Sequence, residues 1–400
     1  MAQPNSRYLD NWITNYLQYT YYSEAPEEFH FWTAVSSIAA ALQRKCWLPM
    51  GHFNFSTNFF IVFVAKPGVV TKSSSIDMGR AIMSGVKSII FGPDAITWQA
   101  IPQLLQQSAV HYQMSDGSFF PMSCLTFASS ELGNLLDPKN QQFIDLLVTM
   151  WDGKDTFSKM TKMSGCENIA NPWVNILAAT TPDWLSDNLP KGLVGGGFIS
   201  RCMFVYGRKK RHVIAYPARV MKNLNFDLQH FKDLLTHDLE SISMLEGPFT
   251  MTDDAMDYGE QWYIQHCAKM ELAENETSGF LARKQASVHK LAMVLSASES
   301  NSMIVEKKHL VTAIKFTEAL EADYPFIFQK LHSTPESDKS DRLVTFLRQY
   351  PQGYPKRQLF QQFYNHFSNF HQFEDALNTL VQADLVRLSM NGSDVIVQLV

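Results

Sequence analysis

Cysteine is scarce in this chain and is not arranged as a disulfide framework or a zinc site requires. The 400 residues include five cysteines, none in a Cys-x-x-Cys pair: Cys46, Cys124, Cys166, Cys202 and Cys267. An odd number of scattered cysteines is typical neither of disulfide-stabilised secreted domains nor of cysteine-bound zinc. We therefore expect a protein of the reducing cytoplasm.

Long apolar runs and a strong charge imbalance are also missing. No apolar run approaches the roughly 20 residues that cross a bilayer, and the first residues, MAQPNSRYLDNW, lack the charged-then-apolar plan of a secretory signal. These absences predict a soluble protein without a membrane partner. A formal net charge of -5 excludes a surface that is basic all over, although a basic loop or channel can still hold nucleic acid locally.

Four short, continuous apolar runs stand out in the first half of the chain. Hydrophobic residues make up 46% of the sequence, which is enough for a sizeable core. Continuous runs of this length are typical of strands buried on both faces of a mainly parallel sheet. Helical patterns at 76–83 and 96–107 would provide crossovers, so we predict an α/β core with a parallel sheet. The four runs are Phe59–Val64, Cys124–Ala128, Val174–Ala178 and Cys202–Tyr206.

The other segments predict further regions around this core. Residues 1–50 have helical apolar spacing, residues 51–215 would form the core, and residues 216–333 have the pattern of a helical lid. A polar linker is predicted at 332–340. In the last region, residues 338–400, three helical segments and a turn at Asn391-Gly392 are the plan of a winged helix.

The segment AKPGVVTKS, residues 65–73, has the Lys-Ser ending of a phosphate-binding loop but lacks its glycines. Lys66 and Thr71 stand where the pattern G-x-x-x-x-G-K-[ST] has glycine, so the letters alone favour an ordinary turn. The context favours a phosphate loop, because an apolar strand enters it and serines suited to helix capping leave it. We predict that this loop binds ATP and, through Ser73, Mg²⁺. The binding residues would be Pro67, Gly68, Thr71, Lys72, Ser73 and Ser74.

A carboxylate follows the second apolar run directly. In a phosphate-loop ATPase a glutamate at this point polarises the attacking water, so we predict that Glu131 is the catalytic base. The alternative is that Glu131 only caps the next helix. Ser130 stands where a magnesium-associated aspartate usually precedes the base, so the metal would depend on Ser73, phosphate oxygens and water.

The third and fourth runs are flanked by two further candidates. Thr180 follows the third run, where a hydroxyl can sense the γ-phosphate or hold the water; a helix cap on the segment 183–185 is an equal alternative. Arg201 follows the glycines of GGGFIS just before the fourth run. It could reach a neighbouring subunit and neutralise charge in the transition state, or pair with a surface carboxylate.

Taken in order, these motifs resemble a family of phage- and plasmid-encoded replication ATPases. The resemblance covers about residues 8 to 330 and rests on AKPGVVTKSS, SIDMGRAIM, FASSELGNLL, WDGKDTFSKMTKMSGCENIANPWVNILAATTPDWL, GGGFISRCMFVYG and RKQASVHKLAMVLS. Members occur alone or fused behind a primase-polymerase and are often described only as domains of unknown function; in one branch the loop looks like A-x-P-G-x-x-x-K-[ST]. The resemblance implies an AAA-like or superfamily-three-like core, a hexameric homo-oligomer, helicase activity and, for a phage protein, the host cytoplasm. By position it implies that Lys72 and Ser73 form the nucleotide loop, Glu131 is the catalytic acid, Thr180 the sensor and Arg201 the trans-acting arginine.

The segment between the second and third runs is the best candidate to touch DNA. Glycines bracket an extended stretch, 151–165, that carries three lysines and an aromatic ring for stacking: Lys154, Phe157, Lys159 and Lys162. An insertion at this point of a ring-forming ATPase faces the channel, where a few lysines can track phosphates. The basic run at 208–211 fits a solvated loop as well as a DNA contact. The third helix of the predicted winged helix carries Glu374 and Asp375, so it fits a protein contact as well as DNA.

The sequence therefore predicts an ATP-dependent, ring-forming DNA helicase or translocase. It would act on single-stranded or forked DNA during phage or plasmid replication, together with other replication proteins. One alternative is a replication initiator or helicase loader that uses ATP as an assembly switch. Another is a winged-helix DNA-binding or adaptor protein without ATPase activity.

Overall fold

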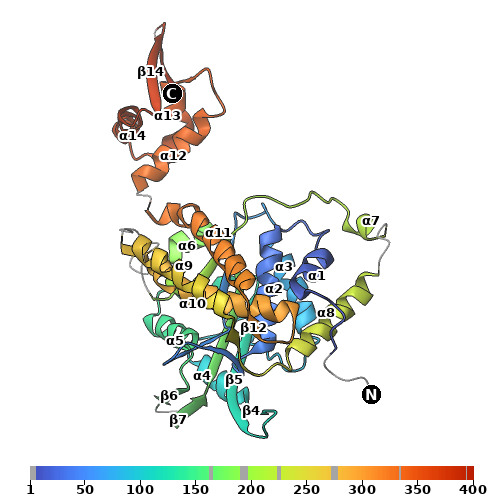
Figure 1. Ribbon diagram of the computed structural model, residues 1–400. Helices are drawn as coiled ribbons and strands as arrows, with labels where there is room; N and C mark the ends of the chain where they lie inside the picture. Colours follow the sequence, from blue (N-terminus) through green and yellow to red (C-terminus); the bar gives the residue numbers. More distant parts are fainter. Residues whose placement is uncertain are drawn as a thin grey trace. The chain divides into compact units, whose positions relative to one another are not determined.

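The computed structural model describes residues 6–161, 165–189, 197–222, 227–271, 278–332, 335–392 and 394–400 (Figure 1). The chain forms two compact units, Met1–Ile327 and Phe328–Val400. One predicted DNA contact, Lys162, lies outside the described residues, as do Gly195 and Gly196 of the predicted glycine-rich turn. Among the described helices, none has the length and apolarity needed to cross a membrane.

A five-stranded sheet forms the centre of the first unit, in the order β4-β5-β8-β3-β9. Four strands pair in parallel, and β4 pairs antiparallel with β5. The predicted α/β class is confirmed, and each of the four apolar runs lies in a strand. The strands are β3 (Phe60–Val64), β4 (Ala109–Gln113), β5 (Phe119–Ser129), β8 (Pro172–Thr180) and β9 (Cys202–Tyr206).

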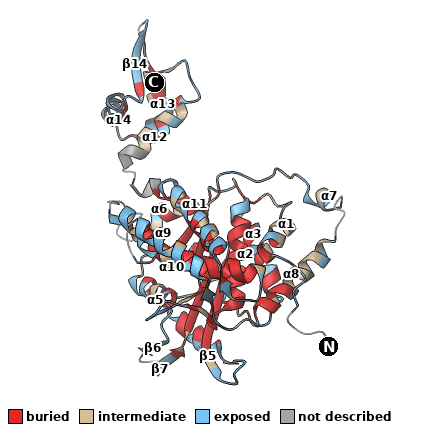
Figure 2. Cartoon of the chain, in the orientation of Figure 1, coloured by how far each residue is buried: buried red, intermediate tan, exposed pale blue. Residues whose placement is uncertain are grey.

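Burial explains why these strands are continuously apolar. Every residue of β3 and of β8 is buried, because both strands lie inside the sheet and helices lie on both of its sides (Figure 2). α2 (Glu27–Leu42) and α3 (Lys72–Met83) pack on β8 and on each other, and α5 (Gln141–Asp152) packs on β8 as well. The helical crossovers therefore cover the sheet as a mainly parallel arrangement requires.

The contact between α2 and α3 is unusually close and fixes the position of α3. A Cβ atom built on Gly79 of α3 would lie 2.2 Å from Cγ2 of Thr33 on α2, so only glycine fits there. α2 is buried from Phe29 to Leu42. Its last turn is closed by a buried lysine, because Lys45 Nζ donates to the carbonyl oxygens of Ala41 and Leu42 at 3.0 and 3.2 Å.

A buried histidine on α2 makes stability depend on pH. Burial, and secondarily the charge of Arg211, lowers the pKa of His30 from 6.5 to about 3. The unfolded chain then binds more protons below pH 6.5, so stability should fall as the pH drops, by up to about 1.4 kcal/mol per pH unit. We expect His30→Leu to show a smaller loss between pH 7 and pH 5 than the wild type in urea unfolding. His52→Leu, at an exposed site, is the control; identical pH dependence in wild type and His30→Leu would contradict the assignment.

Smaller elements complete the first unit. Three further sheets pair β10-β1-β2, β11-β12 and β6-β7. The strands are β1 (Cys46–Pro49), β2 (Asn54–Ser56), β6 (Thr156–Thr161), β7 (Gly165–Ala170), β10 (Gly247–Pro248), β11 (Thr250–Met251) and β12 (Ile304–Val305). The helices are α1 (Trp12–Tyr19), α4 (Ala100–Gln107), α6 (Pro182–Asn188), α7 (Pro217–Lys222), α8 (Leu228–Ile242), α9 (Asp253–Glu271), α10 (Ser278–Glu299) and α11 (Lys307–His332), whose residues from Phe328 onward belong to the second unit.

The second unit has a hydrophobic core of its own, which includes Leu343, Leu359, Phe373 and Val397. Three helices pack with a small antiparallel sheet in the order β13-β15-β14. The predicted polar linker is wrong in its second half, because α12 begins at Pro335. The elements are α12 (Pro335–Leu347), β13 (Tyr354–Pro355), α13 (Lys356–Phe363), α14 (Phe370–Gln382), β14 (Val386–Asn391) and β15 (Asp394–Leu399).

Candidate functional site

The segment after β3 begins with a tight turn. The Val69 N–H donates to the Lys66 carbonyl at 3.3 Å, and Gly68 has φ +72°. In a type II turn, proline is favoured at the second of the four residues and glycine with a positive φ at the third, and Pro67 and Gly68 occupy these two positions of the turn 66–69. Pro67 and Gly68 therefore reverse the chain directly after the strand.

After the turn, α3 begins without a capping side chain. Thr71 occupies the N-cap position but makes no side-chain cap bond, and Ser73 and Ser74 in the first turn are exposed or partly exposed to solvent. The Lys72 N–H donates to the Val70 carbonyl at 3.1 Å, but no side chain caps the positive dipole end of α3, where an anion is favoured. Lys72 folds back over the loop, and its Nζ donates to the Ala65 carbonyl at 2.9 Å.

Glu131 lies near this lysine. Burial lowers the pKa of Lys72 from its usual 10.5, while the Glu131 carboxylate acts in the opposite direction. Glu131 is exposed and follows β5, where its backbone is held by Ser129: Ser129 Oγ donates to the Glu131 carbonyl at 3.1 Å and accepts from its N–H at 3.3 Å. The Glu131 side chain makes no cap bond to the next turn, Leu132–Asn134. The predicted alternative, a cap on the next helix, is therefore not seen, and the role of Glu131 as the base stays a prediction.

Thr180 reaches the same edge of the sheet through β8. It is 2% exposed, pairs with Val64 of β3, and its carbonyl accepts from the Ala65 N–H at 3.4 Å. The helix cap is supplied by the next residue instead, since Thr181 Oγ1 accepts from the Trp184 N–H at 3.1 Å. The carboxyl ends of three adjacent parallel strands therefore bring together the segments that carry Lys72, Glu131 and Thr180.

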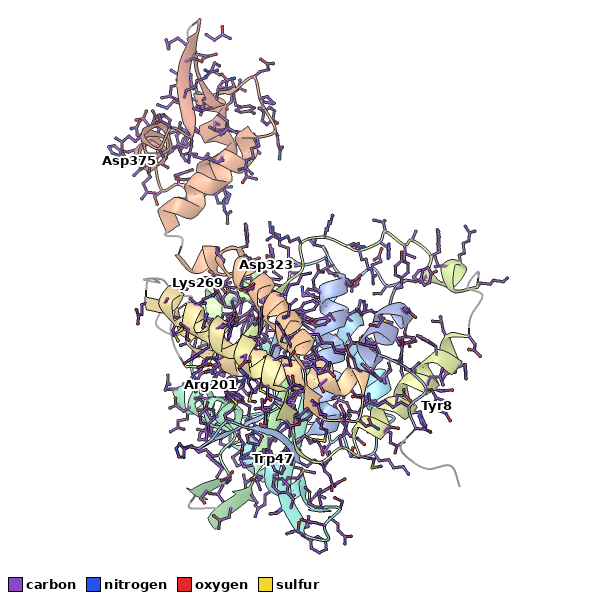
Figure 3. The ribbon with its side chains drawn as sticks, in the orientation of Figure 1. Tyr8, Trp47, Arg201, Lys269, Asp323 and Asp375 are labelled. Atoms are coloured by element: carbon purple, nitrogen blue, oxygen red, sulfur yellow. The ribbon has the colours of Figure 1, made fainter. Side chains whose placement is uncertain are left out.

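Arg201 is placed differently (Figure 3). It precedes β9 and so lies at the amino ends of the parallel strands, whereas Lys72 lies at their carboxyl ends. The Arg201 side chain is 4% exposed. Its guanidinium donates to both carboxylate oxygens of Asp152, at 2.7 and 2.9 Å, and to the Gly197 carbonyl at 2.6 Å. The arginine is thus held inside its own chain by a bidentate pair, and the role in a neighbouring subunit stays a prediction.

The lysine-bearing segment forms a hairpin instead of one extended stretch. β6 and β7 pair antiparallel, and Lys159 in β6 lies opposite Glu167 in β7. Lys154 is exposed and Phe157 is half-buried. The hairpin follows α5 and precedes β8, so it lies at the amino ends of the parallel strands, away from Lys72.

A cavity beside α3 was not predicted from the sequence. It has a volume of about 220 Å³ and is lined by Tyr19, Tyr22, Thr71, Ser74 and Met78, among others. The Thr71 hydroxyl is buried, and no residue in the described part of the chain forms a hydrogen bond with it. The aromatic cluster QYTYYSE at 18–24 was the available signal, but nothing local shows that it packs against a loop some 50 positions later.

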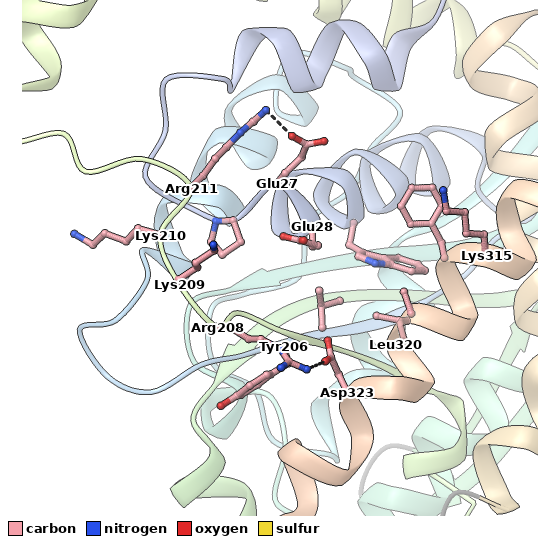
Figure 4. Close-up of a pocket in the computed structure, with 15 residues that line it drawn as sticks. Glu27, Glu28, Tyr206, Arg208, Lys209, Lys210, Arg211, Lys315, Leu320 and Asp323 are labelled. Carbon is pink, nitrogen blue, oxygen red and sulfur yellow. Dashed lines mark hydrogen bonds and ion pairs between the residues drawn. The ribbon is translucent and has the colours of Figure 1, made fainter. Parts of the chain in front are cut away.

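The basic run after β9 is engaged within the chain (Figure 4). Arg208 pairs with Asp323 at 2.5 Å, Lys210 with Glu24 at 2.7 Å and Arg211 with Glu27 at 2.5 Å. These contacts join the segment after β9 to Glu24 before α2, to the first turn of α2 and to α11. Most of the run is therefore structural in this chain, and Lys209 is the member without such a pair among the described residues.

Comparison with known proteins identified no relative, and the described residues include no cluster of metal-binding side chains. No protein-family model matches the chain, and no curated protein matches it. Within the described residues, no group of three or more His, Cys, Asp or Glu side chains could hold a metal ion. A metal at this edge would therefore depend on hydroxyl groups, water and the oxygens of a ligand.

Proposed function

We propose that this protein is an ATPase that binds ATP at the loop 65–73 and works as a ring-forming translocase or helicase on DNA. One observation carries the proposal: an uncapped helix N-terminus, Lys72, Glu131 and Thr180 meet at the carboxyl edge of three adjacent parallel strands. Ligands of open α/β sheets bind at this edge. A strand, a tight loop and a helix in this order are also the context that a phosphate-binding loop needs.

The surroundings of the loop suit a nucleotide. The N–H groups at the start of α3 and Lys72 would hold the phosphates, and the cavity lined by Tyr19 and Tyr22 has room for a base. The unpartnered Thr71 hydroxyl would gain an acceptor. Mg²⁺ would sit on Ser73, phosphate oxygens and water, where it neutralises phosphate charge. Glu131 would orient the attacking water, and Thr180 would report on the terminal phosphate.

DNA would be contacted away from the nucleotide. The hairpin β6–β7 with Lys154, Phe157 and Lys159 is the proposed contact for single-stranded or forked DNA. The second unit, with its three helices and antiparallel strands, has the elements of a winged helix and would bind DNA or another replication protein.

A helicase loader or initiator is the second candidate. Arg201 is buried in its pair with Asp152, and Ser130 replaces the usual metal-associated aspartate. Both features favour slow hydrolysis, with ATP acting as an assembly switch.

Titration of single-stranded DNA into an ATPase assay, with the mass of the assembly measured in parallel, tests these proposals. Strong stimulation by DNA is expected for a motor. Weak hydrolysis with ATP-dependent assembly would favour the loader, and absence of nucleotide binding would leave a DNA-binding or adaptor protein.

A further inference from the structure

The first unit carries a groove with an apolar floor and a basic rim. The groove has a volume of about 600 Å³ and opens at the end of β9, between the first turn of α2 and α11 (Figure 4). Trp32, Phe316 and Leu320 are among its apolar lining. Five basic residues outnumber three carboxylates around it: Arg208, Lys209, Lys210, Arg211 and Lys315 against Glu27, Glu28 and Asp323. The groove therefore has a net positive charge.

Two lysines at this groove are available to a partner. Lys209 and Lys315 are exposed, and within the described part of the chain no ion pair joins either to a carboxylate. Glu28 is the one carboxylate of the lining for which no ion pair is seen among these residues. The groove thus fits an acidic surface that also offers apolar side chains.

The outer face of α9 has this complementary chemistry. Ala255 and His266 are the only buried residues of this helix, which Figure 2 shows mostly in pale blue. Met256, Tyr263 and Ile264 are 49%, 40% and 63% exposed, which is unusual for three apolar side chains on one short stretch. Residues 253–264 of this helix carry four carboxylates and no Lys, Arg or His: Asp253, Asp254, Asp257 and Glu260.

We propose that α9 of one copy docks into this groove of a second copy. Met256 and Ile264 cover the apolar floor, and Glu260 meets the rim at Lys209 and Lys315. The contact joins two different surfaces, so it is head-to-tail and can close into a ring. The strip from 256 to 264 is about 12 Å long, which suits the centre of an interface. The inference rests on the oligomeric ATPase proposed above and identifies the surfaces through which its copies meet.

Charge reversal on each side tests the contact in the full chain. Light scattering after size-exclusion chromatography should show self-association weakened at least about tenfold in Glu260→Lys and in Lys315→Glu, because like charges then meet. The chain with both substitutions should assemble like the wild type, since each junction again joins opposite charges. Asp145→Lys, at an exposed site on α5, is the matched control and should assemble normally.

Several results would overturn the inference. These are unchanged assembly in either single variant, failure of the double variant to assemble, and a wild type that is monomeric with and without ATP. Loss of oligonucleotide binding in Lys315→Glu with assembly intact would assign the groove to DNA instead. Binding of a fluorescent ATP analogue is measured on the same proteins. If the wild type binds no nucleotide but the charge swap still governs assembly, the proposed function fails and the contact stands.

Discussion

Lys72→Ala is expected to weaken ATP binding by about 10- to 150-fold, because a charged hydrogen bond to phosphate contributes about 1.5–3 kcal/mol. The Lys72 ammonium is half-buried at the start of α3 and bonds only to the Ala65 carbonyl among the contacts seen, so its loss should leave the fold intact. Titration calorimetry with ATP and Mg²⁺ measures the affinity, and circular dichroism checks the fold.

Lys66→Ala is the matched control for this experiment. Lys66 belongs to the same loop, but it is exposed and its carbonyl, rather than its side chain, closes the turn with Val69. ATP affinity should change by less than about threefold, as for other exposed charges. Equal losses in Lys66→Ala and Lys72→Ala would mean that the loop attracts ATP only through its overall charge, and equal retention in both would remove the loop from the site.

Glu131→Gln is expected to lower ATP turnover by about 10² to 10⁴-fold while ATP still binds. The amide keeps the size of the side chain but cannot accept the proton of the attacking water. Affinity should be retained or improved, since removal of a carboxylate near Lys72 also removes repulsion toward polyphosphate. Phosphate release and nucleotide binding are measured on the same preparation.

Asp145→Asn provides the comparison, because it makes the same chemical change at an exposed site on α5. Its turnover should match the wild type. Full turnover in Glu131→Gln would refute the assignment of the base. Joint loss of binding and turnover would instead mean that Glu131 supports the loop, through its effect on Lys72, rather than the reaction.

The central strands of the sheet were predictable because burial on both faces requires short segments of mostly apolar residues, which are visible in the sequence. β3 and β9 are continuous apolar segments in the sequence, and the apolar segment of β8 is interrupted by Asn175. β4 has no such segment: Ala109–Gln113 is an edge strand with mostly exposed residues, and it was not predicted. The start of α12 was misplaced, because residues 335–340 were predicted as linker although Pro335 at the first position is a common helix start.

Contacts between distant segments could not be predicted in this way. The pair between Asp152 and Arg201 spans 49 positions, and the periodicity of either segment says nothing about the other. The cavity lined by Tyr19, Tyr22 and Thr71 also forms between segments that are distant in the sequence, so local patterns do not predict it. By contrast, Lys72, Glu131 and Thr180 were predicted as parts of one site from their places after successive strands, and the structure pairs these three strands in parallel, so that their carboxyl ends lie at one edge of the sheet.

The close contact at Gly79 has a mechanical consequence. Thr33 of α2 leaves no room for a side chain at Gly79 of α3, so the two helices are in close contact at this point. The first turn of α2 lines the groove, and the first turn of α3 carries Lys72. A methyl group added at Gly79 would therefore force Thr33, α2 or α3 to shift, and so would disturb the helices that carry the wall of the groove and Lys72.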